Sequence, residues 1–210
     1  DTLKIEPDSG DGQAWGAKLK VAGVPVLYLP WIRFPVDSRR KTGLLFPDLG
    51  SDTRGGIDIT TPIYLNLAPN YDFLYSPRYI QERGFLQQGK IRLLDPSAGR
   101  WELTGAWLGD DTKYNENGME HSQARWLAEI KHSAELDSNW ATTIKYAQVS
   151  DPDYIRDLEN NTLSAQRQTA LQQMGRVRWM NDAWFFEVEA EQFQSIANDI
   201  AKPYKKLPQV

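Results

Sequence analysis

The chain has 210 residues, of which 40% are hydrophobic and 25% charged, a balance typical of a folded protein rather than a disordered one. Its longest apolar stretch, residues 24–32, is interrupted by Pro25 and Pro30 and falls well short of the ~20 apolar residues of a spanning helix. With a net charge of −4, interspersed signs and no cysteine, the composition excludes a basic nucleic-acid surface, disulfides and Cys-based zinc sites.

The first fifty residues predict short strands followed by a hinge. Residues 3–6, 13–21 and 24–34 have strand-like patterns, and the last segment is apolar on both faces, as expected of a strand buried on both sides. Its prolines remove ladder donors, which suits an edge or an opening. The polar segment that follows, with Arg39, Arg40 and Lys41, predicts the hinge. No cationic leader opens the chain, and its abrupt ending favours an excised piece.

From residue 57 onward, apolar and polar residues alternate, which is typical of strands because successive side chains point to opposite faces. In residues 184–191, for example, Phe186 and Val188 lie on one face, and Glu187 and Glu189 lie on the other. The same pattern predicts eight strands, at residues 57–66, 71–79, 90–93, 100–107, 125–131, 139–147, 176–179 and 184–191.

The connections between these strands alternate between short turns and long polar loops, the latter at residues 109–122 and 150–165. Outer-membrane barrels are built this way, and the predicted strands are nearer the ~9–11 residues of a tilted membrane strand than the ~5–6 typical of soluble sheets. We therefore predict an all-β fold, with antiparallel strands forming part of an outer-membrane β-barrel. The residues expected to face its water-filled lumen are Arg78, Lys90, Arg92, Glu187 and Glu189.

Two other interpretations of the alternation stay open. One is a self-contained small outer-membrane barrel acting as a porin or adhesin. The other is a soluble carbohydrate-binding β-sandwich that uses exposed residues such as Trp101 and Trp107. Folding of the isolated chain to a barrel in detergent would favour the first alternative, and a soluble monomer that binds free glycans would favour the second.

Catalysis and metal binding have little support in the sequence. His121 and His132 show no metal-ligand spacing. Carboxylates gather in the two long loops, at 110, 111 and 116 and at 151 and 153, without the order of a calcium loop, so we expect them to be solvated. We predict no enzyme activity, no cofactor and no metal site.

Pro62 and Pro77 lie inside the first and second predicted strands, where each withholds a backbone N–H from the ladder. Pairing should therefore be weak there. The first strand of a barrel must close against the last, so a weak first pair marks a place where a wall could open sideways. An equally good interpretation is that each proline marks a bulge or a non-bonded position.

Several segments of the chain, taken together, resemble the LptD family of lipopolysaccharide-assembly outer-membrane proteins. They include Pro62, Asp72, Pro77 and the segments 24–31, 34–35, 39–43, 66–70, 83–84, 149–154, 202–204 and 207–209. The resemblance implies a periplasmic β-jellyroll followed by a very large barrel. It assigns residues 1–36 to the end of the jellyroll, 37–53 to a linker and 54–210 to the first strands of the barrel.

The resemblance also implies a function, namely transport and insertion of lipopolysaccharide into the outer leaflet of the outer membrane. It makes Pro62 and Pro77 a lateral gate. It implies that the doubly apolar strand lines a path for acyl chains, through Val26, Tyr28, Leu29, Trp31, Ile32 and Phe34. The implied partners are lipopolysaccharide, the plug lipoprotein LptE, the periplasmic bridge protein LptA and the barrel-assembly machinery. The implied location is the outer membrane, with the N-terminal part in the periplasm.

Overall fold

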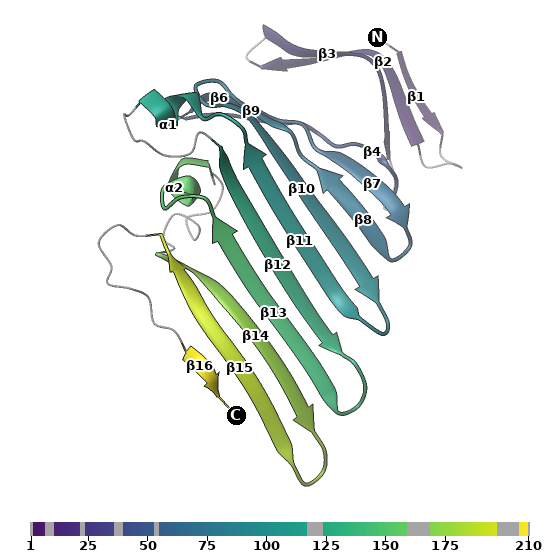
Figure 1. Cartoon of the computed structure of the whole chain (residues 1–210). Coiled ribbons are helices and arrows are strands. Elements are labelled where there is room, and N and C mark those ends of the chain that lie inside the picture. The colour runs from purple at the N-terminus through teal and green to yellow at the C-terminus, as the bar shows by residue number, and fades with distance from the viewer. Residues whose placement is uncertain are drawn as a thin grey trace.

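The structure is a computed structural model, and it describes residues 2–6, 11–21, 24–35, 40–52, 55–116, 124–158, 169–196 and 206–209. Most of the described residues lie in strands, which pair antiparallel in two separate sheets (Figure 1). Within the described residues, no helix has the length and apolar content needed to cross a membrane.

The smaller sheet holds the first three strands in the order β1-β2-β3. Their bounds are β1 Thr2–Glu6, β2 Asp11–Val21 and β3 Val24–Pro35. Each pairs with the next along the chain, and Trp15 on β2 lies opposite Trp31 on β3. The three predicted N-terminal strands are thus present, and they form a sheet of their own.

The larger sheet has 13 strands within the described residues and is a single open layer (Figure 1). Its first six strands are short: β4 Gly43–Leu44, β5 Asp48–Asp52, β6 Gly56–Thr60, β7 Ile63–Ala68, β8 Tyr71–Tyr75 and β9 Arg78–Ile80. The next six are long: β10 Gly84–Asp95, β11 Gly99–Leu108, β12 Arg125–Glu135, β13 Trp140–Val149, β14 Ala170–Met180 and β15 Phe185–Ser195. The last, β16, spans Lys206–Gln209.

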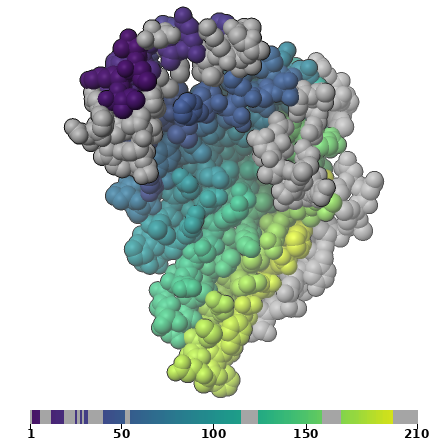
Figure 2. Space-filling view, turned by 180° about the vertical axis from the view of Figure 1, so that it is seen from behind, coloured from purple at the N-terminus to yellow at the C-terminus, as the bar shows by residue number. Residues whose placement is uncertain are grey.

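Each long strand pairs with its neighbours in chain order, so the strands follow one another as oblique bands across the surface (Figure 2). The pairing register fixes two faces. Trp107 lies opposite Trp126 and Val177 opposite Val188, whereas Lys90 lies opposite Thr104. We call the first side the apolar face and the second the polar face. The all-β antiparallel fold predicted from the alternation is confirmed.

The two ends of the larger sheet differ. At the turn end, three tight connections at residues 96–98, 136–139 and 181–184 join the long strands. Each is held by a side chain that accepts backbone N–H groups: Asp95 from Ser97 and Ala98, Asp137 from Trp140, and Asn181 from Trp184. Such side chains stabilise turns by mimicking a backbone turn. The opposite end, which we call the loop end, carries the long connections.

Two short helices lie in the long connections, α1 at Thr112–Glu116 and α2 at Tyr154–Leu158. The apolar residues of α2 are buried against a patch of the polar face near the loop end, where apolar side chains replace the charged ones. This core contains Ile80, Leu86, Ala106, Leu108, Val149, Tyr154, Ile155, Leu158 and Leu171. The loop 150–165, expected to be only polar, thus supplies a large part of the core.

The range 37–53, predicted as a hinge, contains two strands. β4 pairs with β7 and β5 pairs with β6, so residues 43–52 run along the outside of the first hairpin. Leu44 lies opposite Ile63 and Leu49 lies opposite Ile59, so apolar residues pair here although the surrounding composition is polar. Within the described part of this range, residues 40–42 and 45–47 lie outside the strands.

Candidate functional site

The first hairpin of the larger sheet is interrupted at the same level in both of its strands. The predicted strand 57–66 is split into β6 and β7 around Pro62, and the predicted strand 71–79 is split into β8 and β9 around Pro77. Thr60 lies opposite Arg78 on one side of the interruption, and Ile63 lies opposite Tyr75 on the other. The residue count is equal on both strands, so neither proline introduces a bulge.

The two prolines withhold donors from different neighbours. Thr61 donates its N–H to the carbonyl of Pro77 at 3.0 Å, and Leu45 donates to the carbonyl of Pro62 at 2.8 Å. In an antiparallel ladder such pairs normally exchange two bonds. Because proline has no N–H, the return bond is missing in both pairs. Pro77 thus weakens the hairpin itself, and Pro62 weakens its contact with the strand outside it.

The opposite side of the hairpin keeps its ladder. Ser76 donates its N–H to the carbonyl of Gln88 at 2.8 Å, and the register with β10 runs unchanged from Tyr75–Gly89 to Arg78–Leu86. The interruption therefore lies between the first strands and does not extend into the wall formed by β10 to β15.

A third proline, Pro47, belongs with these two, and it was not predicted from the sequence. Pro47 lies between β4 and β5, where the register shifts by one residue: Leu44 pairs with Ile63, but Asp48 pairs with Thr60. Prolines at 47, 62 and 77 are evenly spaced along the chain. That regular spacing was the available signal, and it went unused because residue 47 fell inside the predicted hinge. We call these three positions the proline line.

A charged cluster holds the hairpin on the turn-end side of the proline line. Asp72 is buried at its centre, and Arg92 donates to both of its oxygens, at 2.8 and 3.0 Å. Arg40, from the segment before β4, also pairs with Asp72 and donates to the Tyr64 hydroxyl at 2.8 Å. The bond to Tyr64 raises the pKa of Arg40 further, so this guanidinium stays charged. We call these four residues the Asp72 cluster.

Another arginine holds the hairpin on the loop-end side. Arg78 on β9 is 7% exposed, and its Nε donates to the two oxygens of Asp58 on β6, at 2.9 and 3.0 Å. Its Nη1 donates to the backbone carbonyl of Leu158, the last residue of α2. One side chain thus joins β6, β9 and a helix from a distant loop.

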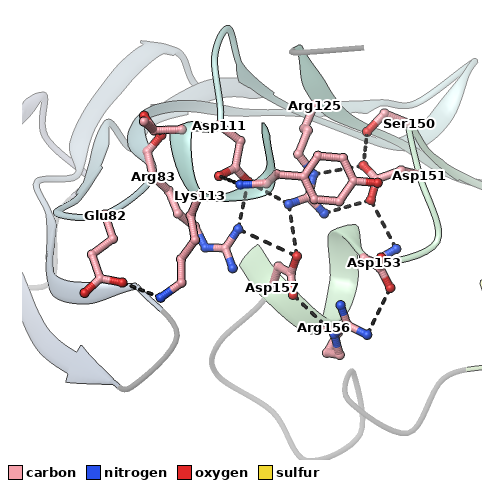
Figure 3. Close-up of polar contacts among 12 residues, drawn as sticks. Glu82, Arg83, Asp111, Lys113, Arg125, Ser150, Asp151, Asp153, Arg156 and Asp157 are labelled. Carbon is pink, nitrogen blue, oxygen red and sulfur yellow. Dashed lines mark hydrogen bonds and ion pairs between the residues drawn. The ribbon is translucent and has the colours of Figure 1, made fainter. Parts of the chain in front are cut away.

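A larger ionic cluster ties the two long connections together at the loop end (Figure 3). Arg125, at the start of β12, is almost fully buried, with its side chain 1% exposed. It donates to both oxygens of Asp151 at 2.9 and 2.7 Å, to Asp111 at 2.6 Å and to Asp157 at 3.1 Å. Arg83, from the tight turn after β9, also donates to Asp111, at 2.8 Å. We call these five residues the Arg125 cluster.

The aspartates of this cluster also begin the two helices. Asp111 accepts the backbone N–H of Tyr114 at 3.1 Å, and Asp151 accepts that of Asp153 at 3.1 Å, as capping residues do. The Tyr114 ring lies beneath the Arg125 guanidinium, at 4.2 Å from the ring centre, and burial raises the pKa of its hydroxyl.

The expectation that the loop carboxylates are solvated is therefore wrong for Asp111, Asp151 and Asp153, whereas Asp110 is exposed. Asp111 and Asp151 are buried because a buried arginine compensates their charge. Asp-Pro at 151–152 is a typical helix start, and it was the available signal for α2. In the described part of the chain, no group of three or more His, Asp or Glu is placed to hold a metal ion.

The other residues predicted to face a lumen lie on the polar face of the larger sheet. Lys90 pairs with Glu102 at 3.4 Å, and Arg176 contacts Glu187 at 3.8 Å and forms an ion pair with Glu189. A hollow of about 720 Å³ lies over the middle of this face. Charged residues that line it include Lys90, Arg100, Glu102, Glu129 and Lys131. Whether this face borders a lumen remains a prediction.

The residues predicted to line a lipid path lie on β3. Tyr28 and Trp31 are exposed, on opposite faces of the small sheet. The side chains of Val26, Leu29, Ile32 and Phe34 lie outside the described part of the structure. His121 also lies outside the described residues, whereas His132 stacks on Trp101 with ring centres 3.9 Å apart. The structure brings Pro62, Pro77 and Arg78 together but does not join them to the predicted lining.

The fold and the hairpin define a class of protein: all-β chains whose long antiparallel strands have one apolar and one charged face, as in the walls of outer-membrane barrels. Comparison with known proteins gives the family. The family model described as "LptD: LPS transport system D" matches residues 123–210.

Relatives match the whole chain. LPS-assembly protein LptD of Pseudomonas aeruginosa (strain LESB58) is 36% identical over 210 residues, which are 100% of this chain and 22% of that protein. The LptD proteins of Acinetobacter baylyi and Vibrio vulnificus are 35% and 34% identical, over 99% and 100% of this chain and 25% and 26% of their own lengths. The chain is therefore similar over its whole length to proteins of the LptD family, and it spans about a quarter of the length of these relatives.

Proposed function

We propose that this chain forms part of an outer-membrane translocon that transports lipopolysaccharide and inserts it into the outer leaflet, and that the proline line is its lateral gate. The support for transport is the similarity to proteins named for lipopolysaccharide assembly. The observation that carries the gate is the loss of two ladder bonds at one level, one within the first hairpin and one between the hairpin and the strand outside it, while the register within the hairpin is unchanged across Pro62 and Pro77.

Lipopolysaccharide has apolar acyl chains and a polar sugar portion, so its route needs a dry side and a wet side next to each other. The larger sheet offers both. Its apolar face exposes large side chains such as Trp107, Phe186 and Val188, which suit a lipid boundary. Its polar face carries the charged hollow near Lys90 and Glu102, which suits hydrated sugars. The proposed function is transport and requires no covalent reaction.

The remaining assignments are part of the same proposal. Residues 1–36 are the end of a periplasmic jellyroll, 37–53 connect it to the barrel, and 54–210 are the first barrel strands. Exposed Tyr28 and Trp31 give each face of the small sheet a large side chain suited to contact with acyl chains. The protein lies in the outer membrane with its N-terminal part in the periplasm. Its partners are the plug lipoprotein LptE, the bridge protein LptA and the barrel-assembly machinery.

The test is to restore the missing donors in the full-length protein. Replacing Pro62 and Pro77 together by valine supplies two N–H groups where Leu45 and Thr61 already donate in the other direction. We expect lipopolysaccharide to reach the cell surface more slowly, measured as the rate at which new lipopolysaccharide becomes accessible to a surface label.

A control variant replaces a proline outside the ladder. Pro96 lies in the exposed turn between β10 and β11, and Pro96→Ser should leave delivery unchanged. Normal delivery by the double valine variant, with the new amides protected from hydrogen exchange, would refute the gate at this line.

A further inference from the structure

The loop-end half of the first hairpin is tied to a helix that belongs to a connection far along the chain. Arg78 and Leu158 are 80 positions apart, yet the Arg78 guanidinium donates to the Leu158 carbonyl in a buried contact. The last carbonyls of a helix have no partner within the helix, and arginine side chains commonly satisfy them. The bond therefore completes the end of α2 with a residue from the hairpin.

Apolar packing reinforces this bond. Tyr154 and Leu158 of α2 are fully buried, and they share one core with Ile80, the residue two positions after Arg78 on β9. The same core includes Leu86 on β10 and Leu108 on β11, so the helix bridges the hairpin and the wall.

Charge fixes both the start and the last turn of α2. Asp151, which precedes the helix, accepts from Nε and Nη2 of Arg125, and Asp157, next to Leu158, accepts from Nη1 of the same guanidinium. Because Arg125 begins β12, the helix cannot shift without disturbing a buried ion pair on the wall. The helix is therefore a rigid support for whatever it contacts on β9.

We propose that α2 is a latch on the loop-end half of the gate, with Arg78 as the positioning residue through which it acts. Asp58 extends the latch to β6, since Arg78 holds it with two hydrogen bonds. The half made of β6 and β9 stays closed with the wall, and the half made of β7 and β8 moves first, with the proline line as the hinge. This inference rests on the proposed gate and assigns the order in which it opens.

The experiment is hydrogen exchange of the full-length protein in detergent, without lipopolysaccharide, read separately for β6 with β9 and for β8. In Arg78→Met, we expect the amides of β6 and β9 to exchange at least about tenfold faster and those of β8 to be unchanged. In Leu158→Ala, which leaves Arg78 and Asp58 in place, we expect the same pattern at smaller amplitude.

The matched control is Arg92→Met, which removes an arginine that binds an aspartate on the other side of the proline line. This substitution should accelerate amide exchange in β8 and leave amide exchange in β9 unchanged. If Arg78→Met fails to fold, Arg78→Lys keeps the charge beside Asp58 but loses the fork, and it should accelerate β6 and β9 alone. Unchanged exchange at β9, or equal acceleration of β8 and β9 in the Arg78 and Leu158 variants, would overturn the latch.

The test is separable from that of the gate. Exchange is measured without substrate, so it reports on the latch whether or not the double valine variant slows delivery. Conversely, slow delivery by that variant with no selective exchange in Arg78→Met would keep the gate and reject the latch.

Discussion

The first strands of the larger sheet and the wall that follows them are held together in different ways. β10 to β15 are ten to twelve residues long and pair without interruption over nearly their whole length. β4 to β9 are two to six residues long, and the proline line divides them. In the wall, the backbone ladder provides the cohesion. In the first strands, side chains provide it, through the Asp72 cluster on one side of the line and Arg78 on the other.

Under the proposed gate, one sheet would combine a permanent part with a part that opens. A continuous ladder separates only if many hydrogen bonds break together. A ladder interrupted by proline and held by a few ionic contacts separates in steps, because each contact can be lost on its own. Four substitutions test this difference, and they are described in order of decreasing expected effect.

The largest effect is expected from Arg125→Met. It leaves Asp111 and Asp151 buried without their main cation, and breaking a buried ion pair in this way costs about 3–5 kcal/mol. The long connections should become sensitive to protease, and the urea midpoint of unfolding in detergent should fall. Arg176→Met is the control, because its pair with Glu189 is partly exposed and such pairs contribute about 0–1 kcal/mol. Similar losses from both would contradict the buried role of Arg125.

A smaller loss is expected from Asp72→Ala. It removes the acceptor shared by Arg40, Arg92 and Tyr64, and hydrogen bonds to charged groups contribute about 1.5–3 kcal/mol. The two arginines are partly exposed, so water can solvate them again. Amides of β7 and β8 should exchange faster, whereas those of β13 and β14 should not change. Uniform acceleration over the sheet would show that the hairpin is no separate unit.

Gly99→Ala tests a turn of the wall. Gly99 has φ +72°, and a Cβ there would lie 2.3 Å from the Cβ of Ala134. The left-handed conformation alone costs a residue with a Cβ about 1–2 kcal/mol. The substitution should lower the unfolding midpoint. Gly105→Ala on the same strand meets nothing within 4 Å and should leave the midpoint unchanged or raised. A neutral Gly99→Ala would mean that the turn adapts.

The smallest change in global stability is expected from Pro77→Val. The restored bond to Thr61 contributes about 1 kcal/mol, and the greater freedom of the unfolded chain offsets about 0.4–1 kcal/mol of it. The unfolding midpoint should therefore hardly move, while the new amide at residue 77 is protected. Pro96→Ser again serves as the control. An unprotected amide at 77 would show that this pair does not close.

Much of the wall could be predicted from sequence, and the side-chain contacts could not. Alternation in residues 139–147 and 184–191 depends only on neighbouring residues, so it predicts both the strand and its faces. The missing N–H of proline predicted weak pairing at Pro62 and Pro77, but the intact register around them depends on partner strands. The buried state of Asp111 and Asp151 depends on Arg125, a residue that local pattern cannot assign to them. The apolar patch on the polar face was not predicted for the same reason, since only contact with α2 explains why Leu86 and Leu108 are apolar and buried.

The unchanged register across Pro62 and Pro77 would matter for a gate that opens repeatedly. A slip by one residue would turn every side chain of a strand to the other face, placing Asp72 and Arg78 toward the apolar side. No extra residue at Pro62 or Pro77 offers an intermediate alignment, so a separated hairpin has a single favourable way to close. If the proposed gate operates here, each passage of a lipid would end with the strands in their original alignment, and the wall would regain the same seal after every opening.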